Sequence, residues 1–113
     1  MTLISQGEAL SAKLDASHKE LREWIVKASA ADKAYVYKYS TEYLIAEGTS
    51  EARKATANLN SLAEREADKL AENMIKVVFS EIKSTQQQIS LIQTFAKAQY
   101  EQEQGGIRGQ GNG

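Results

Sequence analysis

The feature that most constrains this chain is its lack of helix-breaking residues. It contains no proline, and only two of its seven glycines precede residue 105. Alanine, glutamate, lysine, glutamine, leucine and serine dominate this region, and most of them favour helices. A β or α/β fold would need turn signals roughly every ten residues, and this stretch does not have them. The sequence therefore predicts an all-α protein.

The first segment, about residues 2–47, places apolar and small residues in steps of three and four, the period of one helix face. This stripe consists of Leu3, Gly7, Leu10, Leu14, Ser17, Leu21, Trp24, Ala28, Ala31, Tyr35, Tyr39, Tyr43 and Ala46. Ser29 and Asp32 are a candidate capping pair, so a first segment folded back there into a closed three-helix bundle is an alternative. Neither glycine nor proline supports that break, and we favour one long helix.

The corner Glu47-Gly48-Thr49-Ser50 is the most specific structural signal in the chain. Gly48 suits the left-handed conformation that ends a helix. Thr49 or Ser50 can then accept a hydrogen bond from a free backbone N–H of the next helix. Glu51 lies in the first turn of that helix, where a negative charge favours the dipole. We therefore predict a tight antiparallel connection at residues 48–50.

The second segment, about residues 51–103, also has helical periodicity over a length typical of a coiled coil. Its predicted stripe is Ala52, Ala55, Leu59, Leu62 or Ala63, Ala67, Leu70, Met74, Val77 or Val78, Ile82, Thr85, Ile89, Ile92, Ala96 and Gln99. The first three are expected to pack against Tyr35, Tyr39 and Tyr43 across the corner. Residues 1–104 would then form a single helical-hairpin domain. Residues 105–113 contain five glycines and are predicted as a flexible, non-helical tail.

Both segments carry apolar residues off their stripes, more than two helices can bury against each other. Left exposed together, they would form a patch larger than soluble monomers usually tolerate. We therefore expect a second interface, formed by self-association into a dimer or small bundle or by another protein. Aromatic residues are frequent anchors of such interfaces, and the candidates are Trp24, Tyr35, Tyr37, Tyr39, Tyr43, Phe79 and Phe95.

The sequence contains no arrangement that resembles a catalytic or metal site. It has no cysteine and a single histidine, His18, so no zinc site is expected. Its carboxylates are scattered beside basic residues, and no glycine-rich phosphate loop precedes a helix. We expect a protein that is not an enzyme and needs no cofactor.

The charges are nearly balanced, with 14 basic and 15 acidic residues and a formal charge of −1. Such a balance gives no field that steers nucleic acid or an anionic membrane. A weaker alternative is single-stranded nucleic acid binding by a patch around Tyr37, with contacts from Lys33, Lys38, Arg53 and Lys54. Neighbouring acidic residues cancel much of that patch's charge.

The chain shows no apolar run of the roughly 18 residues needed for a membrane span. Its first six residues do not place a basic region before an apolar one, as a signal peptide would. We therefore expect no membrane association and a cytoplasmic location.

Residues 43–55, from Tyr43 through the Gly-Thr corner to Glu51-Ala52-Arg53-Lys54-Ala55, resemble a pattern in small helical proteins of tailed bacteriophages. Those proteins have an alanine- and tyrosine-rich helix, this kind of corner and a long second helix, and the resemblance covers about residues 30–100. Ala52 departs from a reciprocal capping arrangement, which would have an acid there. The resemblance implies an accessory phage protein of the host bacterial cytoplasm, and some relatives are encoded near recombination and replication functions. No functional residue is carried over.

Taken together, these features favour a non-enzymatic interaction protein, a phage-like accessory factor that binds or inhibits a host or phage component of DNA processing or defence. A nucleic-acid-binding helical protein and a purely structural, self-assembling scaffold are the alternatives.

Overall fold

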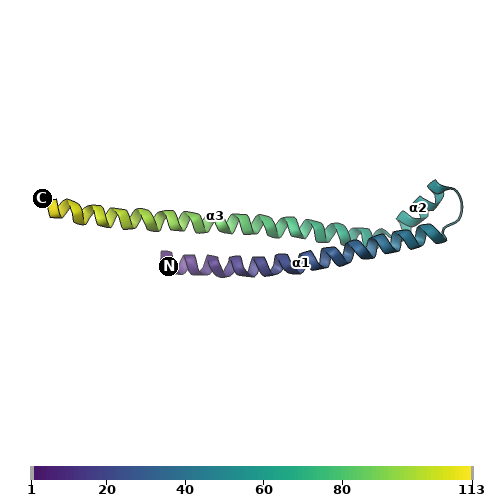
Figure 1. Cartoon of the computed structure of the whole chain (residues 1–113), viewed down its shortest axis with the longest axis horizontal. Coiled ribbons are helices and arrows are strands. Elements are labelled where there is room, and N and C mark those ends of the chain that lie inside the picture. Colours follow the sequence, from purple (N-terminus) through teal and green to yellow (C-terminus); the bar gives the residue numbers. More distant parts are fainter. Residues whose placement is uncertain (1, 113) are drawn as a thin grey trace. The chain divides into compact units, whose positions relative to one another are not determined.

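The computed structural model describes the backbone of residues 2–112 and the side chains of residues 2–104. Three helices follow one another: α1 (Leu3–Ile45), α2 (Ser50–Asn60) and α3 (Leu62–Asn112). The backbone of residues 2–112 contains no strand. The chain reverses direction between α1 and α2 (Figure 1). The predicted all-α helical hairpin is confirmed.

The helices form two compact units. Unit 1 combines residues 1–18 with residues 80–113, and unit 2 is Lys19–Phe79. Unit 2 therefore contains most of α1, all of α2 and the beginning of α3. Unit 1 contains the first turns of α1 and the rest of α3.

α1 is one continuous helix. Thr2 caps its start, since its hydroxyl accepts the backbone N–H of Ser5 at 3.1 Å. The helix continues through Ser29 and Asp32, so the alternative with a break at this point is wrong. Every residue of the predicted α1 stripe is buried or half-buried. The stripe prediction for the first segment is thus confirmed.

The corner between α1 and α2 has the predicted chemistry. Gly48 has a φ of 104°, a conformation that costs glycine little because it has no β-carbon. Thr49 is the N-cap, and its hydroxyl accepts the backbone N–H of Ala52 at 3.2 Å. Glu51 lies in the first turn of α2. Thr49 thereby fixes where α2 begins and which of its residues face α1.

The second segment is two helices rather than the predicted one, because the helix breaks at Ser61. Ser61 has φ −109° and ψ 13°, in the sparsely populated bridge region. Its hydroxyl donates to the Ala57 carbonyl at 2.6 Å, a bond that its own backbone N–H also makes, at 3.0 Å. Serine hydroxyls that bond back to the preceding turn often bend helices. This side chain accounts for the break.

The predicted stripe of the second segment is wrong before Met74. The buried positions there are Ala57, Ser61 and Ala71, whereas Leu59 is 72% exposed and Leu70 57% exposed. Thr49 caps α2 one turn before Arg53, so Arg53 faces α1. The same face of α2 continues through Ala57. From Met74 to Ile92 the predicted positions hold, with Val78, Ile82 and Thr85 buried, whereas Ala96 and Gln99 at the end of the predicted stripe are exposed.

The glycine-rich end also differs from its prediction, because α3 continues to Asn112. Glycine costs a helix about 1 kcal/mol per residue relative to alanine but does not block it sterically, as proline does. The side chains of residues 105–113 lie outside the described part of the chain. Flexibility of this segment stays a prediction.

Replacing Gly48 by alanine tests the corner. A β-carbon there would meet the Ala52 β-carbon at 3.4 Å, and the φ of 104° strains any L-residue. We expect Gly48→Ala to lower the free energy of unfolding by roughly 1–3 kcal/mol, measured by urea denaturation at fixed protein concentration. Gly7→Ala is the control, because Gly7 is helical with open space around it. It should raise stability by about 0.5–1 kcal/mol. Equal effects of the two variants would contradict this account of the corner.

Candidate interaction surface

The corner of the hairpin is fastened by one arginine. Arg53 of α2 donates from Nε to the Tyr43 carbonyl at 3.1 Å. Its guanidinium lies 4.4 Å from the centroid of the Tyr43 ring. The Tyr43 carbonyl is one of the last four of α1, which have no partner within their own helix. Arg53 therefore satisfies a free helix end and contributes a cation–π contact with the same residue.

Three tyrosines line the inner face of α1 next to this corner. The rings of Tyr35 and Tyr39 meet edge to face at 6.3 Å, and those of Tyr39 and Tyr43 stack at 6.4 Å. All three are half-buried. Ala52, Ala55 and Leu59, their expected partners, are exposed, so that expected packing is wrong. The tyrosines contact one another, and Arg53 covers the last of them.

The Tyr43 hydroxyl lies 3.4 Å from the Ser50 hydroxyl at the start of α2. This hydrogen bond is the main cause of a lowered Tyr43 pKa, with smaller contributions from the charges of Arg53 and Lys54. Tyr43 thus bonds to α2 through both ends of the residue, its carbonyl and its phenol. It is a structural residue of the corner.

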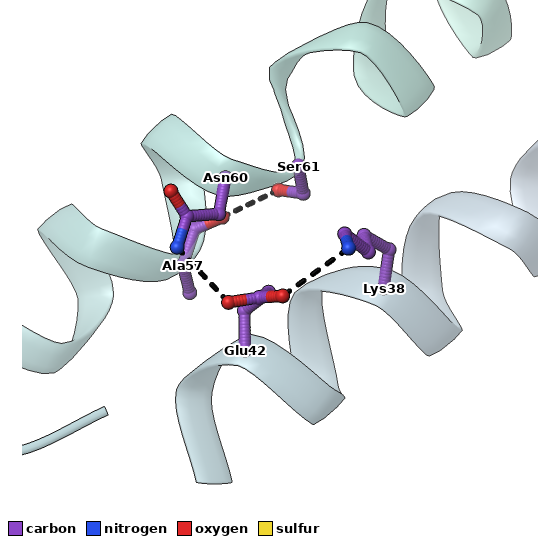
Figure 2. A network of polar contacts seen from close by, with 5 residues as sticks. All are labelled: Lys38, Glu42, Ala57, Asn60 and Ser61. Carbon is purple, nitrogen blue, oxygen red and sulfur yellow. Dashed lines mark hydrogen bonds and ion pairs between the residues drawn. The ribbon is translucent and has the colours of Figure 1, made fainter. Parts of the chain in front are cut away.

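A polar network joins α1 to the end of α2 (Figure 2). The Glu42 carboxylate accepts from the Asn60 side-chain amide at 2.9 Å and pairs with the Lys38 ammonium at 3.2 Å. The Asn60 hydrogen bond is the main cause of a lowered Glu42 pKa, and Lys38 adds to it. Asn60 is the last residue of α2, directly before the buried Ser61. The network therefore ties the break between α2 and α3 to α1.

The inner face of α2 and early α3 carries little apolar volume. Its positions, spaced by three or four residues, are Arg53, Ala57, Ser61, Glu64, Asp68, Ala71, Ile75 and Val78. One Glu64 carboxylate oxygen, Oε2, is buried and has no hydrogen-bond partner among the described residues. A buried polar atom without a partner costs free energy. Unit 2 therefore gains little from the burial of large side chains between its helices.

Many large apolar side chains of unit 2 lie on the opposite sides of its helices, although Trp24 and three tyrosines occupy the inner face of α1. Two residues advance a helix by about 200°, since a turn takes about 3.6 residues. The outer α1 stripe lies two residues after the half-buried positions Trp24, Ala28, Ala31, Tyr35, Lys38 and Glu42, and it consists of Val26, Ala30, Lys33, Tyr37, Ser40 and Leu44. The positions two residues after the inner face of α2 and α3 form the outer α2–α3 stripe: Leu59, Ala63, Glu66, Leu70, Asn73 and Val77. Every residue of both stripes is exposed.

The outer α1 stripe is the more exposed of the two. Val26 is 70% exposed, Tyr37 75% and Leu44 74%. Burial of each such side chain would contribute about 1.5–3 kcal/mol. The spacing of both stripes alternates between four and three residues, the spacing of a coiled-coil seam. Each helical arm of unit 2 thus has a second seam that the hairpin does not cover.

The predicted anchor residues divide between these environments. Tyr35, Tyr39 and Tyr43 lie on the inner face and Tyr37 on the outer α1 stripe. Trp24 is half-buried, with the Lys27 ammonium 4.5 Å above its ring. Phe79 and Phe95 are about half exposed on α3. Of the seven, Tyr37 is the aromatic residue best placed to meet a partner.

The predicted nucleic-acid contacts do not form one free basic patch. Lys38 pairs with Glu42, and Arg53 is engaged with Tyr43. Lys33 and Lys54 remain exposed. Two of the four cations therefore already have partners within the hairpin.

Unit 1 has a shallow groove where small α1 residues leave space beside α3. Gly7, Ser11 and Ala12 line one wall, and Ile89 and Ile92 line the other. The described residues include no group of three or more His, Asp or Glu side chains that could hold a metal ion. Within the described part of the chain, no helix is both long and apolar enough to cross a bilayer.

Comparisons with protein-family models, with curated proteins and with solved structures find no match to this chain. The surfaces described above are therefore the basis for a proposed function.

The Glu42–Asn60 bond gives a pH-dependent prediction. Because the pKa of Glu42 is lowered in the fold from 4.5, its stabilisation is present above that pH and is lost as the pH falls through the folded-state pKa. Asn60→Ala should therefore destabilise the protein at about pH 7 and have much less effect at about pH 3, as measured by urea unfolding. Asn58→Ala, on the exposed side of the same helix, is the control and should show no such pH dependence. A destabilisation by Asn60→Ala that is equal at both pH values would contradict this role of Glu42.

The unpaired Glu64 oxygen gives a second prediction. Glu64→Met removes a buried polar atom without a partner and adds apolar contact. We expect it to raise the free energy of unfolding by roughly 1–2 kcal/mol in the same assay. Glu72→Met is the control, because Glu72 is exposed, and it should change stability by no more than about 0.5 kcal/mol. Loss of stability in Glu64→Met would mean that the carboxylate has a favourable partner.

Proposed function

We propose that this chain is a non-enzymatic interaction protein, an accessory factor of phage type that binds a component of DNA-processing or defence machinery in the bacterial cytoplasm. The observation that carries this proposal is the distribution of apolar side chains in unit 2. Large residues occupy both outer stripes, while alanine, serine and carboxylates occupy much of the inner face of α2 and early α3. Such a hairpin gains more from contact with a partner than from its own interior.

The mechanism in this proposal is steric. A helix face with apolar residues at coiled-coil spacing inserts into a groove or packs beside another helix. The bound chain then occupies or bridges a surface of its target. No proton transfer or covalent step is needed. Neither Glu42 nor Tyr43, whose pKa values are lowered, lies at a cleft.

The nucleic-acid alternative has weaker support, because Lys38 and Arg53 are held by Glu42 and Tyr43. Phosphate binding would also have to show a steep dependence on salt. The scaffold alternative shares the same stripes and differs only in the absence of a foreign partner.

Capture from a nuclease-treated bacterial lysate tests the proposal. The immobilised chain should retain a defined DNA-processing or defence protein, identified by mass spectrometry. Leu70→Ser, which removes the central leucine of the outer α2–α3 stripe, should reduce capture roughly 10-fold or more, as expected for an interface anchor. Asn73→Ser is the matched control on the same stripe and should retain capture. Recovery of the chain alone would favour the scaffold, and capture that occurs only from a parallel, untreated lysate would favour nucleic acid.

A further inference from the structure

The outer α1 stripe has similar residue types at equal distances on either side of its centre. Around Tyr35 as the centre, Val26 and Leu44 lie nine residues to either side, Ala30 and Ser40 five residues, and Lys33 and Tyr37 two residues. The members of each pair match in size or attract each other: two aliphatic residues, two small residues, and a cation with an aromatic ring.

We propose that this stripe is the seam of an antiparallel two-fold dimer, in which α1 of one copy packs on α1 of a second copy. The two-fold axis passes at the level of Tyr35. Val26 of each copy then faces Leu44 of the other, and Ala30 faces Ser40. This inference deepens the proposed function and rests on its premise that the outer stripes are interfaces.

The centre of the seam explains why the outer α1 stripe contains a lysine. In the antiparallel register, each Lys33 meets the Tyr37 ring of the other copy, and the pair occurs twice. A lysine ammonium over a tyrosine ring is attracted by the ring's quadrupole. Lys33 makes no ion pair within the described part of the chain, and Tyr37 is exposed. Both side chains are therefore free for this contact.

The small residues of the seam set the distance between the helices. Ala30 and Ser40 alternate with the larger residues and face each other in the dimer. Small side chains at facing positions let two helix backbones approach while the larger ones interdigitate beside them. The break at Ser61 lies on the other arm, so α1 presents this seam without interruption.

The outer α2–α3 stripe does not fit a copy of itself equally well. The same antiparallel pairing would place Glu66 against Leu70 twice at the centre and Ala63 against Asn73 beside it. A carboxylate pressed against leucine loses hydration and gains no partner. Pairing of the outer α1 stripe with the outer α2–α3 stripe of another copy would be head to tail, which closes only in a ring and otherwise grows without limit. Charge complementarity therefore selects α1 for self-association and leaves the other stripe for a different partner.

Cysteine cross-linking of the purified full chain tests the register. The chain has no cysteine, so introduced thiols report without background. Cα atoms joined by a disulfide lie about 4.4–6.8 Å apart. On an antiparallel dimer, the two copies of residue 30 are separated along the axis by roughly 15 Å, ten residues at 1.5 Å each. Ala30→Cys mixed with a mass-tagged Ser40→Cys should therefore form the mixed disulfide on oxidation, and neither variant alone should link to itself.

Three outcomes would contradict the proposed dimer seam. Ala30→Cys linking to itself would mean a parallel register. An equal or stronger link between Ala63→Cys and Asn73→Cys would assign the dimer to the other stripe. Sedimentation of the unmodified chain as a monomer at all concentrations would remove the dimer altogether.

A solution measurement without cross-linking completes the test. Tyr37→Ser removes both copies of the Lys33–Tyr37 contact and should therefore raise the dimer dissociation constant roughly 30-fold or more, while circular dichroism shows unchanged helix content. Leu70→Ser is the control and should leave dimerisation unchanged, and the reverse result would refute the assignment. These assays use the purified chain alone, so they can fail while lysate capture succeeds. Capture can equally fail while they succeed.

Discussion

The hydrogen bond from the Ala52 backbone N–H to the Thr49 hydroxyl fixes the helical phase of α2, that is, which of its residues face α1. The rest of unit 2 depends on this constraint. Gly48 turns the chain, and Thr49 then determines the first residue of α2. Once that residue is fixed, Arg53 lies under the end of α1 and Ala57 one turn further on the same face. The same phase directs Leu59 outward. A start one residue later would rotate the helix by about 100° and remove Arg53 from the Tyr43 carbonyl.

The inner seam that follows from this phase specifies the pairing of the helices more than it stabilises it. Arg53 on Tyr43 and Asn60 on Glu42 are directional contacts that hold only in one register. Ala57 and Ser61 bury little area, and Glu64 leaves one buried oxygen without a partner. Apolar burial is the dominant favourable term in folding, and in unit 2 several large apolar side chains are exposed on surfaces that face away from the helix pair.

The sequence predicts those parts of the fold that local chemistry decides. The absence of proline, the three-and-four stripe of α1 and the Gly48–Thr49 corner each act within a few residues, and each is found as expected. The sequence does not predict the inner face of α2 and early α3, because the leucines there have helical spacing on the other side of the helices. In α2 and early α3, the leucines lie on the outer face and small residues occupy much of the inner face. Periodicity alone does not distinguish the two faces, because both have helical spacing. Ser61 breaks the helix through a hydroxyl that also occurs harmlessly in helix interiors, and Asn60 meets Glu42 only after the hairpin closes. A search for small and polar residues at helical spacing, running Ala57, Ser61, Glu64, Asp68 and Ala71, would have revealed the second face.

The corner also holds the outer α1 stripe in the geometry that the proposed dimer requires. Tyr43 is fixed by Arg53 and Ser50 on the inner side of the last turns of α1, and Tyr37 and Leu44 project from the other side of the same turns. Ordering a flexible segment upon binding costs free energy, and a segment already fixed in its bound form avoids that cost. Contacts on its inner face hold α1 in place. Its outer residues therefore keep a fixed spacing before any partner binds. The inner contacts therefore set the geometry of the helix pair, and the outer α1 stripe keeps exposed apolar side chains available for the proposed interface.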